Sequence, residues 1–141
     1  MAVSIEVSQE IDRPVTIVFK FYADDHVRNH PRWDPDIELW RTSEEPIGLG
    51  TIIHRRNSHG DTPVEGTMEV TEYKPNRAIG MVIREGPMET DGRATFVEAS
   101  EGRTRLTITA NMPIDESMKD RMSGLVQRSL RNIKELIEAE A

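Results

Sequence analysis

Residues 113–141 read PIDESMKDRMSGLVQRSLRNIKELIEAEA. Apolar residues recur there every three or four positions, which is the spacing of one helix face. That face is formed by Met118, Met122, Leu125, Val126, Leu130, Ile133, Leu136 and Ile137. Pro113 ends the preceding segment, and Asp115 and Glu116 suit the first turn of a helix. The stretch therefore predicts one long C-terminal helix, ending near Ala141, that covers the core built by the rest of the chain.

The middle of the chain, from Asp36 to Met112, alternates short extended runs with turn signals. The runs fall at residues 37–42, 51–56, 64–73, 78–85, 94–99 and 104–112. Gly86-Pro87 and Asp91-Gly92 flank the turn expected before Ala94. Connections this short join antiparallel neighbours, because a parallel crossover needs a dozen or more residues. This region predicts an antiparallel meander.

The N-terminal segment supplies a further strand and two short helices. From Val3 to Ile11 apolar and polar residues alternate, as in a half-buried strand. Pro14 suits the first turn of a helix, and apolar residues follow it at helical spacing. A second short helix is expected from about Asp24 to His30, with Pro31 directing the chain into an extended path.

These elements combine in one economical way. A meander with one apolar face needs a cover, and the terminal helix carries a matching stripe. We therefore predict an α+β fold in which a curved antiparallel sheet of about six or seven strands wraps around the long C-terminal helix, with two short helices after the first strand. At 141 residues the chain is expected to form a single domain, residues 1–141.

The composition argues against several classes of function. The formal net charge of −7 disfavours a nucleic-acid partner, since phosphate binding requires clustered Lys and Arg. The sequence lacks an apolar run long enough for stable membrane insertion, and its start lacks the pattern of a signal peptide. It has no cysteine and therefore no thiolate ligand or nucleophile. A cytoplasmic location is expected.

Two local patterns are interpreted as structural. His26 and His30 are four residues apart, which puts both rings on one helix face, as a zinc pair requires. Because no third ligand is clear beyond Asp34, we expect surface histidines on a short helix and no metal. Gly48-Leu49-Gly50 precedes a strand instead of a helix, so it is a turn, and no cofactor is expected.

Acid–base chemistry would fall to Tyr73, Glu98 or His54, all on expected strands. If Phe96 faces inward, strand alternation places Glu98 inward as well, unless a bulge intervenes. A rim carboxylate at the strand end is the alternative, which we favour because buried acids are rare. The patterns leave open which faces His54 and Trp40 occupy.

Four phrases carry a family resemblance through nearly the whole chain. They are Ile11-Asp12-Arg13-Pro14, Trp33-Asp34-Pro35, Gly48-Leu49-Gly50-Thr51 and the stretch 69–77. In this order the phrases resemble the START-like, or helix-grip (SRPBCC), superfamily, in particular its polyketide cyclase/dehydrase and lipid-transport branch. The resemblance implies the same curved sheet around a central cavity.

The resemblance also implies a range of functions. Members of the superfamily bind lipids, sterols, polyketides, quinones or hormones in the cavity, and only some catalyse a reaction. Aromatase/cyclase members use inward tryptophan, tyrosine and arginine side chains. Trp33 matches the aromatic position, whereas the strand that ends at Tyr73 lacks the expected arginine. This departure lowers the case for cyclase chemistry.

We therefore expect a small hydrophobic ligand, of lipid, polyketide or aromatic type, between the sheet and the C-terminal helix. Methionines suit such an adaptable lining. The expected ligand contacts are Trp33, Met68, Met81, Ile83, Phe96, Met118, Met122, Leu125 and Val126. Two alternatives stay open: a polyketide cyclase/dehydrase-type enzyme that uses the same cavity, and a protein-binding module. A homodimer also stays open.

Overall fold

The strands of the protein form one sheet, which a long helix crosses. The computed structural model describes residues 3–140, so Met1, Ala2 and Ala141 of the expected domain lie outside the described residues. The strands are β1 (Val3–Ile11), β2 (Ile37–Trp40), β3 (Ile52–Asn57), β4 (Val64–Lys74), β5 (Ala78–Glu85), β6 (Met88–Ser100) and β7 (Arg103–Met112). The helices are α1 (Val15–Phe19), the π turn η1 (Lys20–Asp24), α2 (His26–Trp33), the 3-10 turn η2 (Glu116–Met118) and α3 (Lys119–Glu140).

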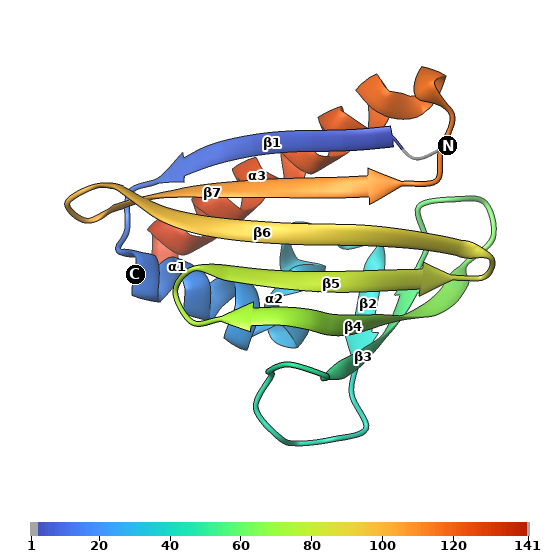
Figure 1. Cartoon of the computed structure of the whole chain (residues 1–141), viewed down its shortest axis with the longest axis horizontal. Helices are drawn as coiled ribbons and strands as arrows, with labels where there is room; N and C mark the ends of the chain where they lie inside the picture. Colours follow the sequence, from blue (N-terminus) through green and yellow to red (C-terminus); the bar gives the residue numbers. More distant parts are fainter. Residues whose placement is uncertain (1–2, 141) are drawn as a thin grey trace.

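The sheet has the strand order β1-β7-β6-β5-β4-β3-β2, and all neighbouring strands are antiparallel. Figure 1 shows α3 crossing one face of this sheet, with α1 and α2 on the same side. Seven strands, two short helices after the first strand and a long C-terminal helix confirm the predicted α+β helix-grip fold.

The rear half of α3 anchors the core. Leu130, Ile133 and Ile137 are 1%, 0% and 1% exposed. Burying apolar surface of this kind is the main stabilising contribution to a fold. At the same end of α3, the Glu138 carboxylate accepts a 2.8 Å hydrogen bond from the Asp12 backbone N–H, just beyond β1. The tight rear half matches the helix packing that the sequence predicts.

Two local predictions are wrong. The helix α2 continues through Pro31 and ends at Trp33. The proline lacks the N–H that would bond to the Val27 carbonyl oxygen, but the next turn still closes, since the Asp34 N–H donates to the His30 carbonyl oxygen at 3.0 Å. The strand β6 starts at Met88, well before Ala94. Gly86, at φ 60°, makes the turn after β5 with Pro87 alone, so the glycine at 92 lies inside a paired strand.

Candidate functional site

The inner face of the sheet is apolar at its centre. Met68, Met81 and Phe96 are 2%, 7% and 3% exposed and belong to one core cluster. Trp33, at the end of α2, belongs to the same cluster, and Ile83 packs against it. These expected ligand contacts therefore lie on the side of the sheet that α3 covers.

The front half of α3 is packed less completely than the rear half. Met118 is 36% exposed, and Met122 and Leu125 are half-buried. Of the apolar residues in this half, Val126 packs against the core cluster, whereas these three do not. The contacts of α3 with the strands are concentrated on β1, at the edge of the sheet. The apolar stripe of α3 is thus buried in the rear half of the helix and only partly buried in the front half.

An ion pair lies on the inner face across three strands. Arg55 of β3 is 6% exposed and stands in register with Gly66 of β4, which stands in register with Glu85 of β5. The Arg55 Nε donates to Glu85 Oε2 at 2.9 Å, over the glycine. A Cβ at Gly66 would lie 3.0 Å from the Glu85 Cγ and 2.0 Å from the Arg84 carbonyl oxygen. Glycine at position 66 therefore allows the close approach of β4 and β5 at the point where the pair spans them.

Arg55 keeps unused hydrogen-bonding capacity. Its side chain is only 8% exposed, yet both terminal nitrogens lack a hydrogen-bond partner within residues 3–140 and retain some accessible surface. A guanidinium has five N–H donors in a fixed plane, and Glu85 uses one of them here. The remaining donors suit an oxygen atom of a ligand.

The two histidines of α2 are not the surface pair that we expected. His26 is 1% exposed because its ring packs edge-on against the rings of Tyr22 and Trp33. Its Nδ1 lies 2.7 Å from the Tyr22 carbonyl oxygen, and its Nε2 lies 2.9 Å from the Nδ1 of His30. Burial lowers the pKa of His26 to about 4 and the pKa of His30 well below its ordinary value. The nearby positive charge of Arg55 lowers both pKa values further.

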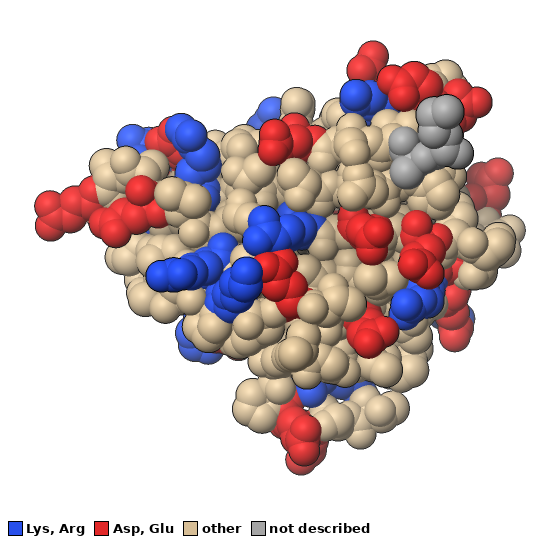
Figure 2. All heavy atoms as spheres, viewed as in Figure 1, with Lys and Arg blue, Asp and Glu red and all other residues tan. Residues whose placement is uncertain are grey.

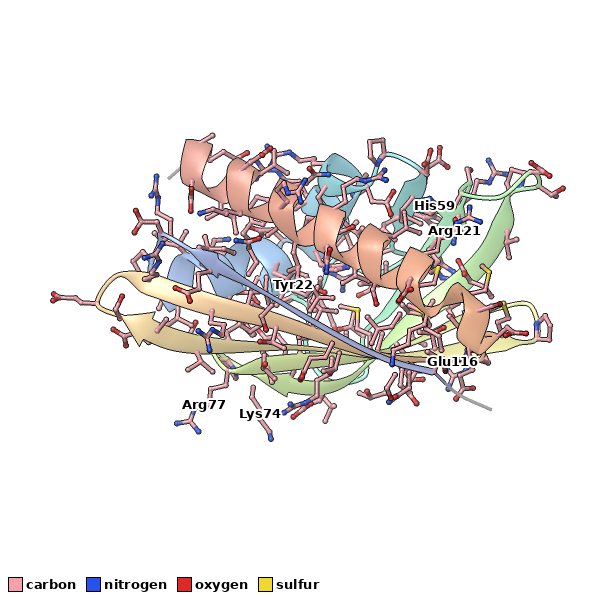
Figure 3. All side chains as sticks on the ribbon, turned by 90° about the horizontal axis from the view of Figure 1, so that it is seen from above. Tyr22, His59, Lys74, Arg77, Glu116 and Arg121 are labelled. Carbon is pink, nitrogen blue, oxygen red and sulfur yellow. The ribbon has the colours of Figure 1, made fainter. Side chains whose placement is uncertain are left out.

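Trp33 is the centre of this aromatic cluster. Its indole stacks with the Tyr22 ring at 5.4 Å and with the His30 imidazole at 4.9 Å between centroids. Asn132 of α3 donates to the Trp33 carbonyl oxygen at 3.0 Å, which ties α2 to the long helix. Figure 3 shows Tyr22 between the sheet and α3, and burial raises its pKa to about 12.

The three acid–base candidates lie in separate places. The Tyr73 hydroxyl donates a hydrogen bond to Asp24. The pKa of Tyr73 is raised to about 12, mainly by burial and to a smaller extent by this hydrogen bond. Glu98 is exposed beside a bulge that interrupts the pairing of β6 with β7, consistent with the rim position. His54 stacks on the 40% exposed Trp40 at 5.8 Å.

The alternation along β3 decides the faces of His54 and Trp40, which the sequence left open. Ile53 and Arg55 are buried on the inner face, so His54 between them faces outward, and Trp40 accompanies it. The structure therefore does not bring the three acid–base candidates together, and their catalytic role stays a prediction.

One group of side chains has the composition of a cation site. Ligand atoms of Asp34, Asp36 and His59 all lie within 4.8 Å of one another. The His59 Nε2 is 2.7 Å from an Asp34 carboxylate oxygen, and its Nδ1 is 3.4 Å from Asp36. These groups satisfy one another and join the β3–β4 turn to the end of α2. The prediction that the chain holds no metal stays a prediction.

The hollows on the surface of the described residues include the following two. The larger, about 470 Å³, is lined by Ser8, Gln9, Glu10, Arg103, Arg105 and Lys134. The smaller, about 200 Å³, lies where α1, η1 and α2 meet the end of α3 and includes Phe21 and Ile137. None of the nine expected ligand contacts lines either hollow. The expected contact set therefore stays a prediction.

A family model described as "Polyketide cyclase / dehydrase and lipid transport" matches residues 2–138. The chain belongs to this family. The START-like resemblance is thereby confirmed across the chain. A search of curated proteins finds no match. Within the described part of this family member, no helix is long and apolar enough to cross a membrane.

Solved structures similar to this family member include three with different descriptions. Ara h 8.0201 has a TM-score of 0.79 at 12% identity, covering 99% of this chain and 100% of its own. A START superfamily protein from Mycobacterium smegmatis has a TM-score of 0.79 at 13% identity, covering 98% and 99%. The Zhui aromatase/cyclase from Streptomyces sp. R1128 has a TM-score of 0.75 at 13% identity, covering 98% and 94%. At such identities these likenesses show the fold alone.

Sequence reasoning missed the inner polar groups of this family member. Arg55 lies on a strand that begins with two isoleucines and so marks no clear inner face, whereas Glu85 continues the alternation of the apolar residues of β5. Only the alignment of the two residues across Gly66 reveals that they pair. The grouping of Tyr22 with the histidines could have been predicted, because positions 22, 26 and 30 are four residues apart and such residues are neighbours on one helix face.

Proposed function

We propose that the protein binds a small hydrophobic molecule between the inner face of the sheet and the front half of α3. The contrast along α3 carries this proposal. Leu130 and Ile133 are sealed, whereas Met118 and Met122 on the same stripe are not. Apolar side chains left partly uncovered on an otherwise packed stripe suit a ligand. The family description supports a ligand of lipid or polyketide type.

A second candidate function, a cyclase/dehydrase-type enzyme using the same space, is favoured by one observation. Arg55 supplies the inward arginine that the strand ending at Tyr73 lacks, with donors free for a ligand oxygen. One of the similar solved structures is itself an aromatase/cyclase. The separation of Tyr73, Glu98 and His54 does not support shared acid–base work by these three, so binding remains the first proposal.

The protein-binding alternative has less support. Figure 2 shows Lys, Arg, Asp and Glu intermixed on the outer face of the sheet. On that face Arg84 pairs with Glu69 at 3.2 Å, and Arg93 pairs with Glu72 at 2.7 Å. Figure 3 shows Lys74 projecting outward from the face of the sheet opposite α3. These ion pairs make the part of the outer face that they cover less suited to an apolar partner surface.

The test is a Met122→Trp variant, compared with a Gln127→Trp control on the exposed side of α3. Binding is measured by the fluorescence of 1-anilinonaphthalene-8-sulfonate and by mass spectrometry of solvent extracts of the purified full chain. We expect Met122→Trp to abolish binding of both the dye and any co-purifying molecule, with a melting temperature close to wild type. The control should bind as wild type does.

Two outcomes would count against the proposal. If wild-type protein bound neither the dye nor any extracted apolar molecule, the binding function would be wrong. If Met122→Trp unfolded the protein instead of blocking the site, the front half of α3 would be closely packed and would have no space for a ligand.

A further inference from the structure

The hydrogen bonds of the two α2 histidines have a fixed direction. A carbonyl oxygen only accepts, so the Nδ1 of His26 must carry the hydrogen that points to the Tyr22 carbonyl. Neutral His26 then has a lone pair on Nε2, and the Nδ1 of His30 must donate to it. The remaining lone pair of the chain therefore lies on the Nε2 of His30.

This terminal nitrogen is available. The Nε2 of His30 has no hydrogen-bond partner within residues 3–140, and it retains accessible surface. The ring orientation is held by the bond to His26 and by stacking on Trp33. Both imidazoles remain neutral near pH 7, because burial lowers both pKa values. The chain of two rings thus presents a fixed acceptor beside the aromatic cluster.

We propose that the Nε2 of His30 accepts a hydrogen bond from an acidic hydroxyl, of the phenol type, on the apolar ligand, and that His26 is a positioning residue that fixes the tautomer of His30. The inference rests on the proposed binding function and specifies its polar end. The positive charge of Arg55, on the inner face of the sheet, lowers the pKa of His30, and a charge of this sign would also favour the ionised form of an acidic hydroxyl held beside it.

The geometry selects among classes of ligand. A carboxylate has only acceptor oxygens and would face the lone pair of His30 without a hydrogen to share. A methyl ether has the same limitation, although it matches a phenol closely in shape. A site that hydrogen-bonds a hydroxyl discriminates strongly against the analogue that lacks it, because the polar group of the site is then left unpaired.

The experiment compares 2-naphthol with 2-methoxynaphthalene by calorimetric titration of the full chain. In wild-type protein we expect 2-naphthol to bind roughly tenfold to a hundredfold more tightly, as one hydrogen bond in a desolvated site provides. His30→Phe retains a ring for Trp33 and should lose this preference while still binding the ether. His30→Gln restores a carbonyl acceptor and should recover part of it.

A spectroscopic readout separates this role from a merely structural one. The emission of bound 2-naphthol depends on whether its hydroxyl has an acceptor, so its spectrum should differ between wild type and His30→Phe, which offers no nitrogen acceptor. Equal wild-type affinities for the two probes, or a preference that persists in His30→Phe, would overturn the role of His30 while leaving the binding function standing. Failure of wild-type protein to bind either probe would overturn the role of His30, and it would overturn the binding function as well only if the dye and the solvent extracts were also negative.

Discussion

Mild acid should destabilise the protein through His26. This histidine is 1% exposed, and its pKa is about 4 in the folded protein, well below the ordinary histidine value of 6.5 that the unfolded chain retains. Above pH 6.5 neither state binds the proton, so His26 adds no pH dependence there. Between pH 6.5 and 4 the unfolded chain binds a proton that the folded protein excludes, so the free energy of unfolding falls as the pH falls. The full difference corresponds to about 3 kcal/mol.

The assay is urea denaturation followed by circular dichroism at several pH values between about 7 and 4.5, in wild type and in His26→Asn. The asparagine retains an N–H for the Tyr22 carbonyl oxygen but does not titrate. The variant should be less stable at about pH 7, because it loses the packing of the ring, and the gap should narrow by about 2 kcal/mol at pH 5. The carboxylates titrate in both chains and largely cancel in the comparison. Parallel stability curves across this range would refute the reasoning.

Two further predictions concern packing. Gly66→Ala should lower the free energy of unfolding by about 1–3 kcal/mol, because its Cβ would overlap the Arg84 carbonyl oxygen and β4 would have to move; urea denaturation with an unchanged midpoint would contradict this. Ile133→Ala removes a side chain that is 0% exposed and should cost about 2–5 kcal/mol in the same assay, whereas Gln127→Ala on the exposed side of α3 should change stability little.

The fold could be predicted from the sequence because its elements carry strong periodic signals. The stripe of α3 extends through Ile137, and the alternation of β1 and the turns between strands agree with one topology. The errors fall where the signal is local. Asp91-Gly92 has the composition of a turn, but the two residues after Glu85 had already reversed the chain.

The burial of His26 and Arg55 could not be predicted from the sequence, for physical reasons. A histidine suits a surface or a core, and the burial of His26 depends on rings from Tyr22 and Trp33 that meet only in the folded protein. The strand β3 begins with two isoleucines, so its alternation does not reveal that Arg55 faces inward. The burial of Met68 and the apolar stripe at the front of α3 were easier to predict, since both follow from periodicity, whereas their contact with a ligand stays a prediction.

The row formed by Arg55, Gly66 and Glu85 has a consequence for how related chains diverge. The three positions lie on three different strands and are distant in sequence, yet each constrains the others. A relative that gains a side chain at position 66 should also have lost the charges at 55 and 85, because a buried charge without its partner is strongly destabilising. Substitutions at these positions should therefore appear together in an alignment of the family, as a covarying triplet whose middle member is glycine whenever the outer two are charged.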